Sequence, residues 1–206
     1  MRRRSIALIL GLATIPAFAQ TAQDKKLCSG ADAPPDQKIA ACTAVILSQQ
    51  TSNPDRARAY FFRALADSDK QLPDEAIADL TASVAINPHD ADAWFNRGIN
   101  YHRQERIDLA IADYSKAIAL DPKIYDYWLS RGLAYRKTDQ LDAAIADYTR
   151  AIQLKPDSAD AYTMRGLAYE KVHRSEPAIA DYRAALKLDP KRIEAKLGLM
   201  LHNIEP

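Results

Sequence analysis

The sequence predicts an all-α protein in which pairs of helices stack into one continuous array. The main observation is a block, AIADYSKAIALDP, that begins at Ala110, returns at Ala144 and Ala178, and has a looser copy at Ala76. Each copy starts 34 residues after the last, a period typical of stacked helix pairs. The composition, 48% hydrophobic and 27% charged with a mean hydropathy of −0.34, excludes a disordered chain and a multispan membrane protein.

The repeats share residue types at fixed positions, counted with Ala57, Ala91, Tyr125 and Ala159 as position 1. Small residues at positions 8 and 20 suit a close helix crossing, and bulky residues at positions 4, 11 and 24 fill the space around it. Proline at position 32 ends the second helix. Acidic or hydroxyl residues are expected to cap or favour the start of each second helix: Asp74, Asp108, Asp142 and Ser175.

With these residues the chain resembles the tetratricopeptide repeat family, strongly over residues 57–190 and weakly over residues 36–54. The matching pattern is aromatic, small, aromatic, Ala, aromatic, Ala and Pro at positions 4, 8, 11, 20, 24, 27 and 32. The first full repeat departs most, because Asp67 and Leu80 replace aromatic residues. The resemblance implies a right-handed α-solenoid of helix–turn–helix repeats, with units at 57–90, 91–124, 125–158 and 159–192.

Both ends of the array are expected to differ from a full repeat. Residues 20–56 are predicted to form a degenerate half-repeat, in which a helix over Asp36–Leu47 is crossed by the extended chain before it. Residues 191–206 are predicted to form a C-terminal capping helix over the last repeat. Its expected inward face consists of apolar residues at helical spacing: Ile193, Leu197, Met200 and Leu201.

The N-terminus has the features of a secretory signal peptide over residues 1–19. Three arginines precede an apolar stretch at residues 5–15, and Ala17 and Ala19 provide the small residues of a cleavage site before Gln20. An uncleaved anchor is the alternative, although the apolar stretch is short of the roughly 20 residues of a bilayer span. No membrane span is expected after cleavage.

The two cysteines, Cys28 and Cys42, are expected to form a structural disulfide. Their spacing is too wide for a C-x-x-C redox pair, and no further cysteine or histidine lies close enough to complete a metal site. A signal peptide and a disulfide together indicate an exported bacterial protein in the periplasm; a Gram-negative source is suggested by resemblance alone.

No known catalytic or nucleotide-binding motif occurs, and the four histidines fall at unrelated repeat positions. We therefore expect no enzyme activity, cofactor or metal. The near balance of 28 Lys+Arg against 27 Asp+Glu gives no electrostatic footprint for nucleic acid.

Two charges recur in every repeat, an arginine at position 7 and an aspartate at position 23. One interpretation is a ladder of arginines that binds an anionic ligand; the other is a set of Arg–Asp pairs that join neighbouring helices. Perfect recurrence favours the structural pairs. They are Arg63, Arg97, Arg131 and Arg165 with Asp79, Asp113, Asp147 and Asp181.

The resemblance implies that the first helices line a concave groove, and there the repeats differ. An apolar stripe with flanking charges is expected to contact a partner, although the stripe could instead be partly core. The candidate groove residues are Phe61, Leu65, Phe95, Ile99, His102, Arg103, Leu129, Leu133, Arg136, Lys137, Thr163, Leu167, Glu170 and Lys171.

The function that these features favour is a non-catalytic scaffold that binds another protein or peptide in the groove. The alternative is a structural subunit of an envelope assembly, or a self-associating protein that acts through its edges. Neither the partner nor the oligomeric state can be deduced from the sequence.

Overall fold

The computed structural model describes residues 17–205, and this part of the chain contains eleven α-helices and no β-strand. Most of the predicted signal peptide, residues 1–16, lies outside the described residues. Over residues 17–205, no helix is both long and apolar enough to cross a membrane. The helices are α1 (Ala17–Ser29), α2 (Pro35–Leu47), α3 (Asn53–Asp69), α4 (Pro73–Ile86), α5 (Ala91–Arg103), α6 (Ile107–Leu120), α7 (Tyr125–Lys137), α8 (Leu141–Leu154), α9 (Ala159–Lys171), α10 (Ser175–Leu188) and α11 (Ile193–Leu201).

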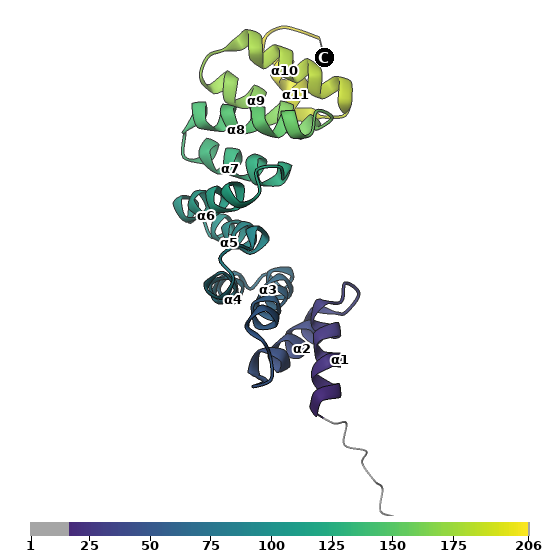
Figure 1. Ribbon diagram of the computed structural model, residues 1–206. Helices are drawn as coiled ribbons and strands as arrows, with labels where there is room; N and C mark the ends of the chain where they lie inside the picture. The colour runs from purple at the N-terminus through teal and green to yellow at the C-terminus, as the bar shows by residue number, and fades with distance from the viewer. Residues whose placement is uncertain (1–16, 206) are drawn as a thin grey trace, which may run out of the picture.

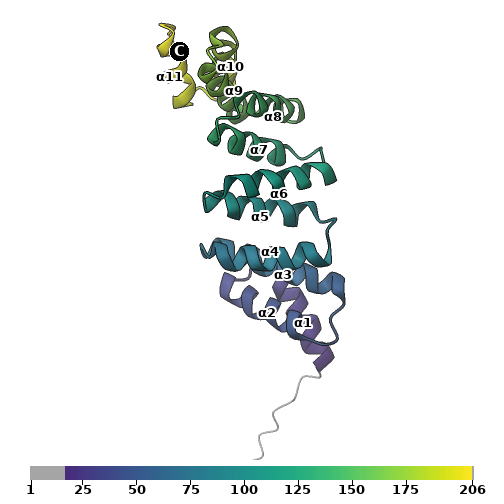
Figure 2. The same ribbon diagram turned by 90° about the vertical axis from the view of Figure 1, so that its left-hand side faces the viewer.

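The helices stack in chain order into an α-solenoid, as the repeat period predicts (Figure 1). Helices α3–α4, α5–α6, α7–α8 and α9–α10 are the pairs of the four repeats, and each pair contacts the next. The view in Figure 2 shows the same ladder from the side, with α1 and α11 at opposite ends. The predicted all-α repeat fold is confirmed.

Within each repeat the two helices cross where a glycine meets a tyrosine ring. A Cβ atom placed on Gly98, Gly132 or Gly166 would lie 2.7 Å from a ring carbon of the tyrosine at position 24 of its own repeat. The four alanines at position 20 are fully buried at the same crossings. The first repeat solves the same problem differently, because Ala64 meets Leu80 there, both fully buried.

The turn between the two helices of each repeat contains a left-handed residue that is not glycine. Position 15 has φ between 57° and 61° in all four repeats. The next residue donates its backbone N–H to the carbonyl five residues earlier, as from Arg106 to Tyr101 at 2.9 Å. This is the six-to-one bond of a Schellman motif. The left-handed residues are Gln71, Glu105, Asp139 and His173.

The expected side-chain caps of the second helices are absent from α4, α6, α8 and α10. The four predicted residues lie inside the first turn, where the three aspartates favour the helix through its dipole and Ser175 makes no cap. Side-chain caps occur instead on three first helices, where Ser52, Asp90 and Ser158 accept backbone N–H groups.

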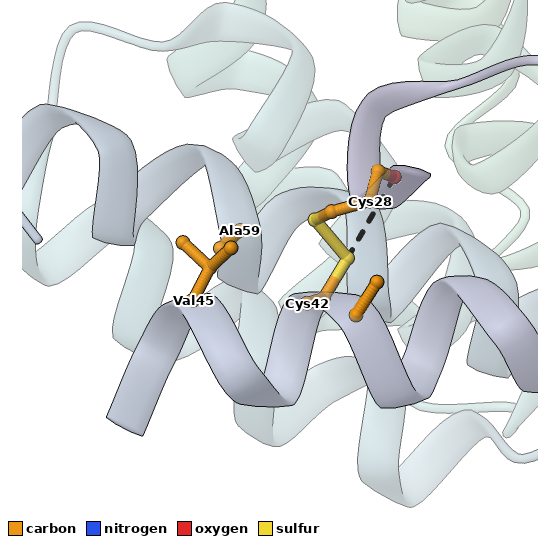
Figure 3. Close-up of a cluster of buried hydrophobic side chains, with 5 residues drawn as sticks. Cys28, Cys42, Val45 and Ala59 are labelled. Atoms are coloured by element: carbon orange, nitrogen blue, oxygen red, sulfur yellow. Dashed lines mark hydrogen bonds between the residues drawn. A yellow bond between two sulfur atoms is a disulfide. The ribbon is translucent and has the colours of Figure 1, made fainter. Parts of the chain in front are cut away.

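The disulfide between Cys28 and Cys42 is present and joins α1 to α2 (Figure 3). It packs with Val45 and Ala59 in a small buried cluster that reaches α3. The segment before Cys28 is helical, so the expectation of an extended chain there is wrong. Helix α1 packs beside α2 as a second helix, and Lys25 at its end pairs with Asp55 of α3 at 2.7 Å.

The last helix, α11, covers the final repeat by packing against α9 and α10. Its buried residues are Ala195, Gly198 and Leu199, not the apolar stripe predicted to face inward. Gly198 sits against the ring of Tyr182, where a Cβ would lie 2.3 Å from a ring carbon. The stripe itself faces away from the solenoid, so that prediction is wrong.

Candidate functional site

The recurring arginines and aspartates form structural pairs, which confirms the favoured interpretation. Each guanidinium donates two parallel hydrogen bonds, through Nε and Nη2, to the aspartate of its own repeat at 2.6–2.9 Å. The aspartates are buried. Hydrogen bonding to Asp79 and Asp181 raises the pKa of Arg63 and Arg165. This bidentate geometry leaves the carboxylates no free face for a ligand.

Each of these arginines also reaches the preceding helix pair. Its Nη1 group donates to a hydroxyl at 2.8–3.2 Å, so one side chain joins three helices. Aromatic rings at positions 4 and 11 lie near the guanidinium, as Trp94 and Tyr101 do at 4.7 and 5.7 Å from Arg97. The sequence reading missed the hydroxyls, although they recur every 34 residues in the full repeats: Thr43, Thr81, Ser115 and Thr149.

The inner face of the solenoid is formed by the first helices. Helices α3, α5, α7, α9 and α11 contact one another in succession, whereas the second helices α4, α6, α8 and α10 do not. Elements that lie closer together mark the inside of a curve. The candidate residues of the groove therefore lie on the helices that line the concave side.

The apolar stripe of the groove is half-buried, so both interpretations are partly met. Phe95 packs against Tyr114 and Tyr127, with ring centroids 5.6 and 4.7 Å apart. Leu129 and Leu133 rest on the buried cluster around Tyr148. Thr163 is fully buried and donates its hydroxyl to the Ala159 carbonyl. Its assignment to the groove surface is therefore wrong.

The partly exposed apolar positions of this stripe are Phe61, Leu65, Phe95, Ile99, Leu129, Leu133 and Leu167. Each keeps some surface open while its remainder is held by the core. Such side chains are rigidly placed and can still be covered by another molecule, which is a common property of interface anchors.

The charged residues beside the stripe divide into paired and unpaired groups. Lys137 pairs with Glu105, and Lys171 lies 3.8 Å from Asp139. Glu170 lies 2.8 Å from the Nε2 atom of His202 on α11. Further candidates, Arg103 and Arg136, make no ion pair within residues 17–205 and so remain available to an outside group.

Three polar atoms of the same region are buried without a hydrogen-bond partner among the described residues. They are Nε2 of His102, Nε of Arg136 and the hydroxyl of Tyr148. Burial, and then the charge of Lys137, lowers the pKa of His102. Burial raises the pKa of Tyr148 to about 12. Buried polar atoms normally have partners, so this part of repeats two and three has unused hydrogen-bonding capacity.

A hollow of about 560 Å³ lies beside the groove between the first two repeats. It is lined partly by predicted residues, such as Arg103, and partly by residues that the sequence reading missed. Asn100 is one of these: it is buried and its amide donates to Ser68 at 3.0 Å. Position 10 holds alanine in the other repeats, a difference that could have revealed it.

The described residues contain no cluster of three or more metal-ligating side chains and no free cysteine. Together with the stacked helix pairs and their open inner face, this defines an α-solenoid repeat protein of the interaction-scaffold class. Family profiles agree with the fold: a TPR repeat profile matches residues 132–172, and a tetratricopeptide repeat profile matches residues 91–124 and 159–192. The chain is a tetratricopeptide repeat protein.

Solved structures support the same fold. The crystal structure of MamA is 24% identical, with a TM-score of 0.71, and the match covers 87% of this chain and 98% of MamA. YrrB, described as a TPR protein with an unusual peptide-binding site, is 18% identical, with a TM-score of 0.75 and coverage of 92% and 93%. The Arabidopsis OM64 TPR domain is 26% identical, with a TM-score of 0.53 and coverage of 55% and 93%. A comparison with curated proteins found no match.

Proposed function

We propose that the protein is a non-catalytic binding module of the periplasm that holds a peptide or protein segment in its concave groove. The observation that carries the proposal is the half-buried apolar stripe bordered by two arginines, Arg103 and Arg136, that make no ion pair within the described chain. Apolar anchors supply most of the affinity of such a surface, and exposed charges mainly steer association. The segment that fits best is apolar with an acidic flank.

Two further features support peptide binding over ligand chemistry. The groove runs along successive first helices, so one extended or helical segment can contact several repeats at once. The unpaired polar atoms of His102, Arg136 and Tyr148 would be satisfied by carbonyl or carboxylate oxygens of such a segment. YrrB, which shares the fold, is itself described as having a peptide-binding site.

The periplasmic location rests on residues 1–19 and on the disulfide. Disulfides persist in oxidising compartments such as the periplasm, and the Cys28–Cys42 bond closes the N-terminal end of the solenoid. A Gram-negative bacterium is the source that fits this combination.

The test uses fluorescence anisotropy with two labelled peptides, each with two leucines one helical turn apart, followed by either two glutamates or two lysines. We expect the acidic peptide to bind more tightly, with an affinity that falls as salt rises. Arg103→Glu should weaken this binding, whereas Lys116→Glu, an exposed residue of the second helix α6, should leave it unchanged.

A second variant addresses the apolar anchors. Leu129→Ala should weaken binding by more than about 1 kcal/mol, the usual threshold of an interface hot spot. Phe95→Ala, the other anchor that the sequence suggests, contacts two core tyrosines and is the less clean choice. Circular dichroism must first show that each variant is folded. Equal affinities for both peptides, or equal losses in Arg103→Glu and Lys116→Glu, would move the functional surface away from the groove.

A further inference from the structure

The outer face of α11 is the most exposed apolar surface among the described residues. Four large apolar side chains on this nine-residue helix are more than half exposed: Ile193 at 67%, Leu197 at 55%, Met200 at 58% and Leu201 at 74%. They lie on the side opposite to Ala195, Gly198 and Leu199, which pack against the last repeat. Together they form a patch of a few hundred Å², a size that marks an interaction site.

The repeat register shows what kind of element covers the equivalent face elsewhere. Leu197 and Met200 occupy positions 5 and 8 of a fifth repeat counted from Ile193. In the second repeat these positions are Phe95 and Gly98, and both contact Tyr114 of the second helix of that repeat. No helix of the described chain occupies this place beside α11. The missing element is therefore another helix with an apolar face.

The charges at the two edges of the patch select the helix that fits. On a helical projection with 3.6 residues per turn, Glu194 lies at one edge of the apolar stripe and Lys196 at the other. Both are exposed, and neither makes an ion pair within the described residues. A two-fold axis parallel to the helix brings the acidic edge of one copy against the basic edge of the other. An antiparallel pair would instead place like charges together.

The opposite end of the solenoid does not offer a matching surface. Helix α1 is mostly polar (AFAQTAQDKKLCS), and the one exposed large apolar residue that it presents is Leu27, at 36%. Head-to-tail stacking of copies would therefore leave the α11 patch against a polar helix. A patch of this kind is self-complementary, which is the requirement of an isologous two-fold interface.

We propose that α11 pairs in parallel with α11 of a second copy, so that two solenoids meet end to end and Glu194 of each faces Lys196 of the other. This inference does not depend on the proposed function, because the groove lies on a different face. A patch of a few hundred Å² per chain is smaller than the roughly 800 Å² per partner of a standard interface. The dimer is therefore weak and reversible.

The test is sedimentation equilibrium of the disulfide-bonded protein, residues 20–206, from about 1 µM to about 200 µM, the range in which small interfaces dissociate. We expect reversible dimerisation of the unmodified protein. Leu201→Glu should raise the dissociation constant about tenfold or more, because it places charges in an apolar contact. The matched control is Leu47→Glu, since Leu47 is equally exposed, at 75%, and lies far from α11. A protein that stays monomeric throughout, or equal effects of the two variants, would overturn the proposal.

The orientation is tested by charge reversal and by cross-linking. Glu194→Lys should weaken the dimer, and Glu194→Lys combined with Lys196→Glu should restore it. In a parallel pair each position meets its own copy, so Leu201→Cys should form an intermolecular disulfide with itself. Cross-linking that requires a mixture of Ile193→Cys and Leu201→Cys proteins would show an antiparallel pair and refute the parallel arrangement. A dimer that is captured only through another protein would refute self-association.

Discussion

Replacing Gly132 with alanine tests how closely the two helices of a repeat approach each other. The new Cβ would lie 2.7 and 2.8 Å from two ring carbons of Tyr148. Carbon atoms normally pack about 3.5–4.0 Å apart, so the ring must retreat by about 1 Å. Tyr148 is fully buried and held in a cluster with Ala144, Ile145 and Ala168, which leaves it little room to move.

Two opposing effects decide the sign of the change. Alanine is favoured over glycine inside a helix by about 0.5–1 kcal/mol. Overpacking a filled core costs about 1–3 kcal/mol. We therefore expect Gly132→Ala to lower the free energy of unfolding by about 1–2 kcal/mol, whereas an open crossing would let the same substitution stabilise the protein.

The first repeat supplies a matched control, because it has Ala64 and Leu80 where the others have glycine and tyrosine. The double variant Gly132→Ala with Tyr148→Leu copies this combination into the third repeat. We expect a favourable coupling of about 1–3 kcal/mol between the two substitutions, as for residues in direct contact.

The measurement is urea unfolding followed by far-ultraviolet circular dichroism, compared at unchanged m-value. The four proteins of the double-mutant cycle are measured under the same conditions, with the disulfide intact. If the two substitutions add within about 0.5 kcal/mol, as independent sites do, the close crossing is not what requires glycine at position 8.

Two further predictions concern the N-terminal part of the chain. Burial, and then the charge of Asp79, raises the pKa of Asp67, so its favourable contribution is complete below the ordinary pKa of 3.8 and is lost as pH rises through the raised value. Asp67→Asn should therefore raise the melting temperature at pH 7, with a gain that shrinks toward pH 4; a gain independent of pH would contradict this cause. The exported protein should begin at Gln20 and show an intact mass with two fewer hydrogens, whereas two thiols titrating in the unreduced protein would exclude the disulfide.

The repeat interior was predictable because every constraint on it recurs. The Gly132–Tyr148 crossing and the Arg131–Asp147 pair each have counterparts 34 residues away, so chance and requirement could be separated from one sequence. The groove was predictable only as a face. Thr163 shares its position with Phe95 and Leu129, but its small side chain is covered by its neighbours, which no positional rule reveals.

The parts that could not be predicted have no repeated signal. Helix α1 has no apolar stripe, and the disulfide and the contacts of α1 with α2 hold it in place. The left-handed turn residues, such as His173, lack the glycine that normally marks this conformation. Helix α11 is apolar on two sides, and the sequence pattern favours the larger side chains, whereas packing against Tyr182 requires the small ones.

The disulfide also gives the solenoid a direction in which it loses order. In a linear array each unit is held only by its neighbours, so the ends open first. The Cys28–Cys42 bond keeps α1 beside α2, so the first pair cannot separate fully and recloses quickly. The other end has no such bond and ends in a short helix that is half exposed. Amide protons of α11 and α10 should therefore exchange with solvent before those of α2 and α3, and reduction of the disulfide should make the two ends alike.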